Sequence, residues 1–252
     1  MSNIGGRKLD HIEICLSRFV EARVSPGFND IYFIHSCIPE LNLDEIDTST
    51  MFLGKRLEAP FIISGITGGH EKSHQINKVI AEVVGELGLG MGVGSQRAAI
   101  ECPSLEYTYS VVREVAPSAL IIANIGASQV VKGYGIKEIM RAIKMVDADA
   151  IAIHVNPLQE SLQLEGEAQW KGFISKLSDI VSNLEVPVIV KEVGCGISRE
   201  VALKLEMIGV KAINVAGLGG TSWAGVEAIR AEEMGDNHKA RLGKTFWDWG
   251  IP

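Results

Sequence analysis

Short, continuous apolar runs alternate with longer amphipathic segments from residue 60 onward. Each run is unbroken, which is the pattern of parallel strands that are buried on both faces. The pattern predicts six strands, at 61–63, 89–93, 120–123, 150–155, 188–190 and 212–215. The alternation therefore predicts an α/β fold built from βα units and a parallel sheet.

The connecting segments carry apolar residues at the three- and four-residue steps of an amphipathic helix. The first such stripe, which we predict faces the sheet, consists of Ile76, Val79, Ile80, Val83, Val84 and Leu87. The same period runs from Trp170 to Leu184, and Pro187 ends that connection just before the fifth strand. Pro103 suits the first turn of a helix in the second crossover.

The strand starts recur about every 30 residues, as in a (β/α)8 TIM barrel. An open doubly wound sheet remains the alternative, but its G-x-G-x-x-G turn does not match Ser64–Gly69, which follows the first strand. Residues 61–252 supply about six of the eight units, so we expect a truncated barrel from a longer protein. Residues 1–60 are predicted to be an N-terminal extension that packs on the barrel, with a helix near 9–21.

The formal charge of −7 disfavours nucleic acid as the main partner, because a phosphate backbone rewards a basic surface. The four cysteines form no C-x-x-C pair, and such sparse cysteines suit a reducing compartment. The chain shows neither a secretory signal nor an apolar run of the roughly 18 residues that a membrane helix needs. We therefore expect a cytoplasmic protein with neither nucleic acid nor membrane as a partner.

Polar and glycine residues follow each predicted strand, where a parallel α/β barrel carries its active site. The glycine-rich runs Ser64–His70 and Gly92–Arg97 follow the first two strands, and Asn124 ends the third. Their backbone amides can approach a planar ring or a phosphate, and Arg97 offers a fork for phosphate oxygens. Ordinary βα turns and a solvated arginine are the alternative interpretation of these residues.

The fourth strand leads into the densest group of candidate residues, from His154 to Glu160. The two-residue period of a strand places His154 and Asn156 on one side. Glu160 could hold Mg²⁺, and Gln159 could hold a substrate by neutral hydrogen bonds. A single histidine in a strand is more often a core residue, but four polar groups within seven residues weaken that alternative.

Two further strand ends and the N-terminal segment add candidate groups. Lys191 ends the fifth strand and could stabilise an anion, and Gly219–Trp223 follows the sixth. Near the start of the chain, Arg7–His11 is a basic cluster that could cap a diphosphate. A surface lysine, a packing indole and a solvated tail are the corresponding alternatives.

Taken together and in order along the whole chain, these motifs closely resemble type 2 isopentenyl diphosphate isomerase, an FMN-dependent (β/α)8-barrel family. The motifs that carry the resemblance are Arg7-Lys8-Asp10-His11, Gly65–Gly69, Gly94-Ser95-Gln96-Arg97, His154–Glu160, Lys191–Gly194 and Gly219–Trp223. Two departures stand out. Ile66 occupies a position where the family is expected to have methionine, and the family has two further strands whose glycine-rich loops grip the FMN phosphate.

The resemblance implies roles for individual residues. FMN would contact Ser64, Gly65, Ile66, Thr67, Ser95, Asn124, Lys191 and Thr221. The diphosphate substrate would contact Arg7, Lys8, Ser95, Gln96, Arg97, His154, Asn156, Gln159 and Trp223. Glu160 would hold Mg²⁺, Glu227 would lie at the site, and the catalytic residues would be Gln159, His154 and Lys191. The family likeness further implies NADPH or NADH as the flavin reductant and a homotetramer or larger oligomer.

The implied reaction converts isopentenyl diphosphate into dimethylallyl diphosphate by a 1,3-proton shift in isoprenoid biosynthesis. The flavin would carry the proton, Gln159 would position the substrate or relay, and Lys191 would stabilise the negative charge of reduced flavin. Two alternatives stay open. One is an FMN-dependent oxidoreductase on a similar barrel, and the other is an inactive truncated subunit that relies on a partner to close its barrel.

Overall fold

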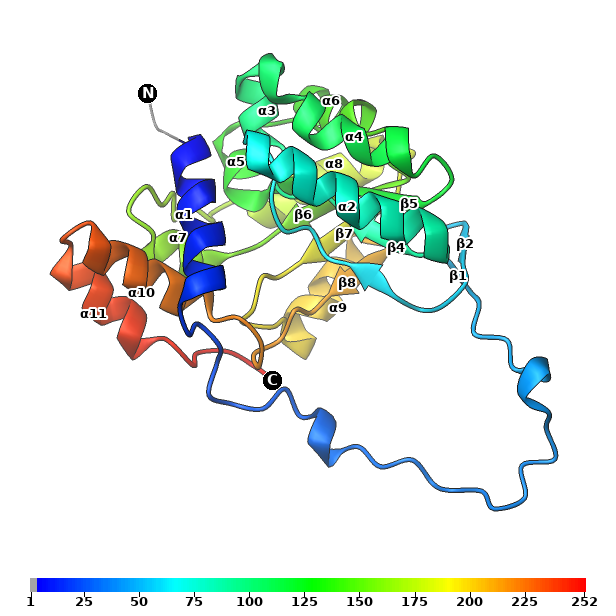
Figure 1. Cartoon of the computed structure of the whole chain (residues 1–252). Coiled ribbons are helices and arrows are strands. Elements are labelled where there is room, and N and C mark those ends of the chain that lie inside the picture. The colour runs from blue at the N-terminus through cyan, green and yellow to red at the C-terminus, as the bar shows by residue number, and fades with distance from the viewer. Residues whose placement is uncertain (1–3) are drawn as a thin grey trace.

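The structure is a computed structural model that describes residues 4–252 and contains a parallel six-stranded sheet with helices on its outer side (Figure 1). The sheet order follows the sequence: β3 (Ile62–Ile63), β4 (Gly90–Gly92), β5 (Leu120–Gly126), β6 (Ala150–His154), β7 (Val188–Lys191) and β8 (Ala212–Asn214). All six predicted strands are confirmed, in the predicted order and parallel.

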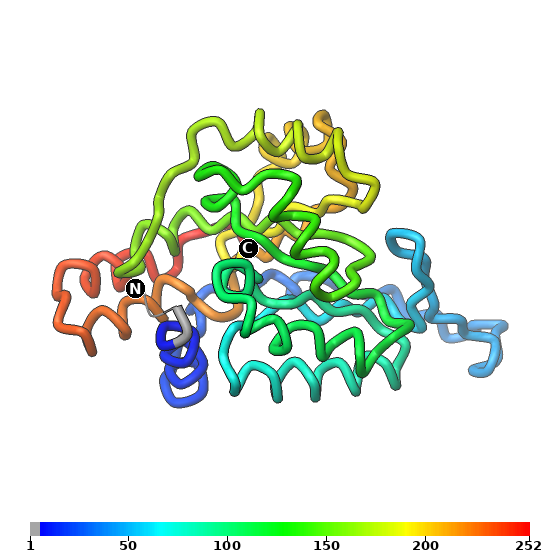
Figure 2. The backbone as a smooth tube through the Cα atoms, turned by 90° about the horizontal axis from the view of Figure 1, so that it is seen from above, coloured from blue at the N-terminus to red at the C-terminus, as the bar shows by residue number. Residues whose placement is uncertain are grey.

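Helices connect the successive strands and cover the convex side of the curled sheet (Figure 2). They are α2 (Glu71–Leu87), α3 (Arg97–Glu101), α4 (Tyr107–Val115), α5 (Ala127–Lys132), α6 (Ile136–Met145), α7 (Pro157–Leu162), α8 (Phe173–Asn183) and α9 (Arg199–Met207). Two more, α10 (Trp223–Glu233) and α11 (Asn237–Thr245), follow β8. This is an α/β fold whose parallel sheet curls like half of a barrel.

The central strands β5, β6 and β7 are buried on both faces, which explains their unbroken apolar runs. Ile121 of β5 and Ile151 of β6 point toward the helices and join the main core. Their neighbours Ile122 and Ala152 point the other way and pack with Leu57. Leu57 comes from the hairpin of β1 (Thr50–Phe52) and β2 (Lys55–Leu57), so this hairpin helps to fill the concave side of the sheet.

The N-terminal residues differ in part from the prediction. The helix α1 (Ile4–Ser17) begins and ends earlier than the expected 9–21, and it packs on α10 through a small apolar cluster that includes Ile14 and Val226. Val20 joins the same cluster, and Glu21 forms a β-bridge with Thr221. From residue 28 to 47 the chain then runs as a long, exposed arm away from the sheet (Figure 1). No helix within residues 4–252 combines the length and the apolar character needed to cross a membrane.

The predicted sheet-facing stripe of α2 is wrong in detail. Val79, Val83 and Leu87 are exposed, although they belong to that stripe. The buried face includes Asn77, whose side-chain amide donates to the carbonyl oxygen of Thr108 at 2.8 Å. The fully buried residues of α2 are Ser73, Asn77, Ala81 and Val84, and hydrogen bonds with Thr67 and Thr108 satisfy the two polar ones.

Candidate active site

A cavity of about 810 Å³ lies where the carboxyl ends of the strands meet. Residues from every strand end and from α1 line it, so the fold brings together groups that are up to about 200 positions apart in the sequence. The predicted site residues among its lining are Arg7, Lys8, Ser64, Gly65, Ile66, Thr67, Ser95, Arg97, Asn124, His154, Asn156, Gln159, Glu160, Lys191, Thr221 and Trp223. The candidate residues therefore converge on one hollow.

The helix α1 brings cations to this cavity. Arg7, Lys8 and His11 line the cavity from α1, and the Lys8 ammonium lies 3.4 Å from the backbone oxygen of Ser95. Burial, with a smaller contribution from the neighbouring Arg7, lowers the pKa of Lys8 to about 7. Lys8 can therefore exchange a proton near neutral pH, and a bound anion would favour its charged form.

Hydrogen bonds fix the orientation of His154 at the end of β6. The side-chain amide of Asn124 donates to the backbone oxygen of Val93 at 3.0 Å, so the Asn124 Oδ1 faces the His154 Nδ1 at 2.8 Å. Nδ1 must then carry the proton, which leaves Nε2 as an acceptor. Burial, with Lys191 and Lys8, lowers the pKa of His154 to about 3, so this ring is neutral at pH 7.

The short helix α7 and the residue before it, Asn156, present three polar side chains to the cavity. Pro157 starts this helix, where a missing N–H costs nothing. The Asn156 amide nitrogen donates to Gln159 Oε1 at 3.0 Å and to Glu160 Oε1 at 3.2 Å. Asn156 Oδ1 is buried and has no hydrogen-bond partner among residues 4–252. A buried amide oxygen without a partner is available to a ligand that lies in the cavity.

Lys191 places a second buried cation at the floor of the cavity. Its ammonium donates to the backbone oxygen of Glu192 at 2.7 Å. The Glu192 carboxylate in turn accepts three backbone N–H groups, from Val193, Gly194 and Cys195, at 2.5–2.7 Å. Burial lowers the pKa of Lys191 and raises that of Glu192, although the two side chains favour each other's charged form.

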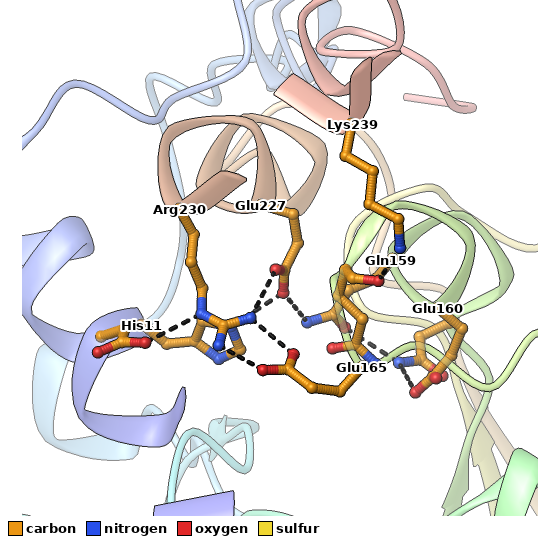
Figure 3. Close-up of polar contacts among 10 residues, drawn as sticks. His11, Gln159, Glu160, Glu165, Glu227, Arg230 and Lys239 are labelled. Carbon is orange, nitrogen blue, oxygen red and sulfur yellow. Dashed lines mark hydrogen bonds and ion pairs between the residues drawn. The ribbon is translucent and has the colours of Figure 1, made fainter. Parts of the chain in front are cut away.

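A buried carboxylate, Glu227 of α10, joins the opposite walls of the cavity (Figure 3). The same oxygen, Oε1, lies 2.9 Å from His11 Nε2 and accepts from Gln159 Nε2 at 3.3 Å. The His11 ring meets the Trp223 ring edge-on, with 5.1 Å between the centroids. Gln159 is thus held from both ends, by Asn156 and by Glu227.

Two glycines allow the loops after β3 and β4 to touch at the cavity wall. A Cβ on Gly65 would lie 2.1 Å from the backbone oxygen of Val93, and one on Gly94 would lie 2.4 Å from that of Thr67. Next to them, Ile66 lines the cavity with 62% of its surface exposed. The result is a close backbone cradle with an uncovered apolar side chain, which suits a flat ligand.

Curated proteins with strong similarity cover nearly the whole chain. Isopentenyl-diphosphate delta-isomerase from Methanosarcina mazei is 51% identical over 98% of this chain and 67% of its own length. The protein of that name from Ignicoccus hospitalis is 53% identical over 98% of this chain and 68% of its own length. The chain belongs to the isopentenyl-diphosphate delta-isomerase family. This membership confirms the family resemblance seen in the motifs.

The other comparisons add little to this assignment. No family model matches the chain. Among solved structures, xylanase 10B from Thermotoga petrophila RKU-1 is 14% identical, with a TM-score of 0.33 over 57% of this chain and 52% of that one.

One residue that the isopentenyl-diphosphate delta-isomerase resemblance implies as a substrate contact lies outside the cavity. The Gln96 side chain is fully buried, and its amide nitrogen donates to the backbone oxygen of Ala142 at 2.8 Å. Its Oε1 accepts from the backbone N–H of Asn124, also at 2.8 Å. The Gln96 side chain therefore connects the loop after β4 to β5 and α6 through hydrogen bonds.

Arg97 reaches the cavity but is already paired. Its guanidinium contacts Glu101 at 2.7 Å and Glu167 at 3.3 Å. Gln129 and Gln163 also line the cavity, although no sequence motif marks them. β5 continues to Gly126, beyond the predicted end at 123, so the segment that follows this strand begins later in the chain and includes Gln129.

Proposed function

We propose that this chain catalyses the isomerisation of isopentenyl diphosphate to dimethylallyl diphosphate. The observation that carries the proposal is the identity of about 50% with isopentenyl-diphosphate delta-isomerases over nearly the whole chain. The reaction adds a proton to the terminal carbon of the double bond and removes one from the methylene on its other side, with no net redox change. The site must therefore bind a diphosphate and manage two protons at carbon.

The charge distribution supports diphosphate binding. The chain has a net charge of −7, yet Arg7, Lys8, Arg97 and Lys191 all line the same cavity. A concave site lined by cations attracts an anion even when the rest of the surface repels it. Arg7 and Lys8 come from α1 and Lys191 from the floor, so the diphosphate would be held between the N-terminal helix and the strand ends.

Glu160 and Asn156 fit a magnesium ion that is shared with the substrate. Within residues 4–252 no three His, Cys, Asp or Glu side chains gather closely enough to hold a metal. Mg²⁺ commonly binds through one or two carboxylates together with phosphate oxygens, so this small donor set is sufficient. The buried Glu160 carboxylate and the unpartnered Asn156 Oδ1 are the oxygens that we assign to it.

The loop cradle fits FMN. The close approach at Gly65 and Gly94 leaves backbone amides at the wall, Ile66 offers an apolar face, and the buried Lys191 would balance a negative ring. Ser64, Thr67, Ser95, Asn124 and Thr221 would contribute further contacts. Reduced FMN supplies a nitrogen that can exchange a proton with carbon, and NADPH or NADH would only reduce it.

The polar contacts of Gln159 suit a positioning role during the proton shift. Its carboxamide is held by Asn156 and Glu227, so its orientation is fixed before a substrate arrives. The neutral His154 contributes an acceptor at Nε2 without adding a charge beside the hydrocarbon chain. Trp223 and Ile66 line the cavity and would exclude water from the isoprenoid carbons.

A closed (β/α)8 barrel is the complete architecture that we propose for the family fold. The six-stranded sheet has two edges, β3 and β8, and the apolar side chains of Ile62 and Val215 are uncovered there. The chain spans about two thirds of the length of the curated relatives. Two further βα units would pair with both edges and remove the open sheet edge.

The decisive experiment mixes the purified chain with prereduced FMN, Mg²⁺ and isopentenyl diphosphate under anaerobic conditions. We expect many dimethylallyl diphosphate molecules per flavin and a flavin spectrum that stays reduced. Stoichiometric flavin oxidation without isomer formation would favour an FMN oxidoreductase. A chain that neither binds flavin nor forms product would instead behave as an incomplete subunit.

A further inference from the structure

Arg230 of α10 is a buried cation next to the cavity that neither the sequence motifs nor the reaction explains. Its guanidinium donates both terminal nitrogens to the Glu165 carboxylate, at 2.6 and 2.7 Å, and its Nε donates to Asp10 at 3.0 Å. A third carboxylate, Glu227, lies 3.8 Å away (Figure 3). Only 4% of the Arg230 side chain and 1% of the Glu227 side chain are exposed, whereas Asp10 and Glu165 are 34% and 41% exposed.

The three partners belong to three different segments next to the cavity. Asp10 lies on α1, one turn or less from Arg7, Lys8 and His11. Glu165 lies in the loop after α7, and Glu227 is on α10. Arg230 is therefore the point at which the helix that carries the diphosphate-facing cations is joined to the rest of the site.

The Glu165 loop is also attached to the proposed magnesium ligand. Two residues after Glu165, the backbone N–H of Glu167 donates to Glu160 Oε2 at 2.7 Å. Between them, a Cβ on Gly166 would lie 1.8 Å from the backbone oxygen of Glu160, so the loop passes directly against α7. A displacement of Glu165 would therefore change the position of the Glu160 carboxylate.

Arg230 also neutralises negative charge next to the cavity. Asp10, Glu165 and Glu227 would otherwise form an uncompensated negative group beside a cavity that must accept an anion. A planar guanidinium can serve a bidentate partner and a third acceptor together, which an ammonium cannot do in the same geometry.

We propose that Arg230 is a positioning residue that fixes α1 and the loop after α7 around the cavity, so that Arg7, Lys8 and Glu160 face a bound diphosphate. The proposal rests on the proposed function for the identity of the ligand. The position of α1 itself does not depend on that assignment, and it can be measured without substrate or flavin.

The test compares Arg230→Met, Arg230→Lys and Asp10→Ala with a matched control, Arg18→Ala. Arg18 also connects the end of α1 with α10, through Glu233 at 3.3 Å, but both side chains are about half exposed. We expect amide hydrogen exchange in residues 8–17 to rise at least about tenfold in Arg230→Met and Asp10→Ala. The control should change less than about twofold, because exposed ion pairs contribute little.

The second measurement is the dissociation constant for inorganic pyrophosphate in the presence of Mg²⁺. We expect it to rise about tenfold or more in Arg230→Met, with part of the affinity restored in Arg230→Lys. In turnover, KM should rise more than kcat falls. A variant with a lower Tm but an unchanged dissociation constant would show a purely structural role and overturn the proposal.

Asp10→Ala keeps the proposal testable if Arg230→Met does not fold, because Arg230 then retains Glu165. Unchanged exchange in α1 of this variant would overturn the proposal. Failure of the proposed function gives a different result: the unaltered chain would form no dimethylallyl diphosphate, while the exchange difference between Asp10→Ala and Arg18→Ala would remain.

Discussion

Lys8 is a buried lysine whose charge should depend on pH near neutrality. Its pKa is about 7 in the folded chain against 10.5 for a free lysine, because burial disfavours the ammonium. Between pH 7 and 10.5 Lys8 binds a proton in the unfolded chain that it lacks in the folded chain. Its contribution to the free energy of unfolding therefore rises with pH over this range. A bound diphosphate favours the charged form of Lys8, so the Lys8 amine takes up a proton when the ligand binds.

We therefore predict that pyrophosphate affinity falls as the pH rises above 7. The contribution of Lys8 approaches about one proton taken up per ligand bound, or tenfold in affinity per pH unit. Calorimetric titrations between pH 6.5 and 9 would measure it. Lys8→Arg is the control, because its charge is permanent and its profile reports the titration of pyrophosphate itself. Parallel profiles for the two proteins would contradict the prediction.

Gln159 should affect turnover more than binding. Its carboxamide lies between Asn156 and Glu227 in the cavity, and it carries no charge with which to attract the diphosphate. We predict that Gln159→Ala lowers kcat by about 100-fold or more and leaves pyrophosphate affinity within about threefold. Steady-state kinetics and calorimetry would separate these effects. A Gln159→Ala protein that retains flavin and full turnover would remove this residue from the scheme.

Replacing Gln96 should lower the free energy of unfolding and leave pyrophosphate affinity unchanged. Replacement by methionine removes two buried hydrogen bonds and leaves the backbone oxygen of Ala142 and the N–H of Asn124 without this partner. We predict a loss of about 2–4 kcal/mol in the free energy of unfolding, measured in urea, with unchanged pyrophosphate affinity. Weaker binding at unchanged stability would restore the substrate contact implied by the family resemblance.

The sequence identifies the cavity-lining residues well because they follow apolar strands directly, as His154 and Lys191 do. It does not identify the Arg230 cluster. Asp10 and Glu165 lie 220 and 65 positions from Arg230. An ion pair between such distant positions leaves no local pattern in the sequence, and a single charged residue is most often part of the solvated surface.

At the scale of elements, the strands are more predictable than the helix faces. A strand buried on both sides needs apolar residues throughout, and β5 is buried along its entire length. The face of α2 is different, since Ser73 and Asn77 are buried through hydrogen bonds to Thr67 and Thr108. Hydrophobic periodicity cannot predict the burial of polar residues whose hydrogen-bond partners lie in other segments of the chain.

The contact between the loops after β3 and β4 gives a prediction at this scale. In Gly65→Ala the new methyl group would overlap the backbone oxygen of Val93, so the cradle must open. We predict a loss of about 1–3 kcal/mol in stability and a weaker FMN affinity, measured by thermal unfolding and flavin fluorescence. Gly135→Ala is the control, because open space surrounds that position. Equal flavin affinity in both variants would show that this loop contact does not shape the flavin site.

At the scale of the whole molecule, the arm of residues 28–47 and the two sheet edges share one property, which is uncovered apolar surface. Tyr32, Phe33 and Ile34 on the arm are 86%, 96% and 100% exposed. Phe61 and Val215 beside the sheet edges are also more than half exposed. Soluble monomers seldom leave large apolar groups together in water, so these surfaces are the expected contacts for further βα units or for another copy of the chain.

The exposed arm predicts that the purified chain associates in a concentration-dependent way. Phe33 and Ile34 are almost fully exposed, so replacing both with serine removes apolar surface without a large effect on the fold. We expect light scattering to show a lower mean mass for this double variant at equal concentration, with a Tm within about 2 °C of the unaltered chain. Met207→Ser is the control, because Met207 is 87% exposed but lies on α9, away from the arm. An unchanged mass in the double variant would place the association at the sheet edges instead, where Val215→Lys should then reduce it.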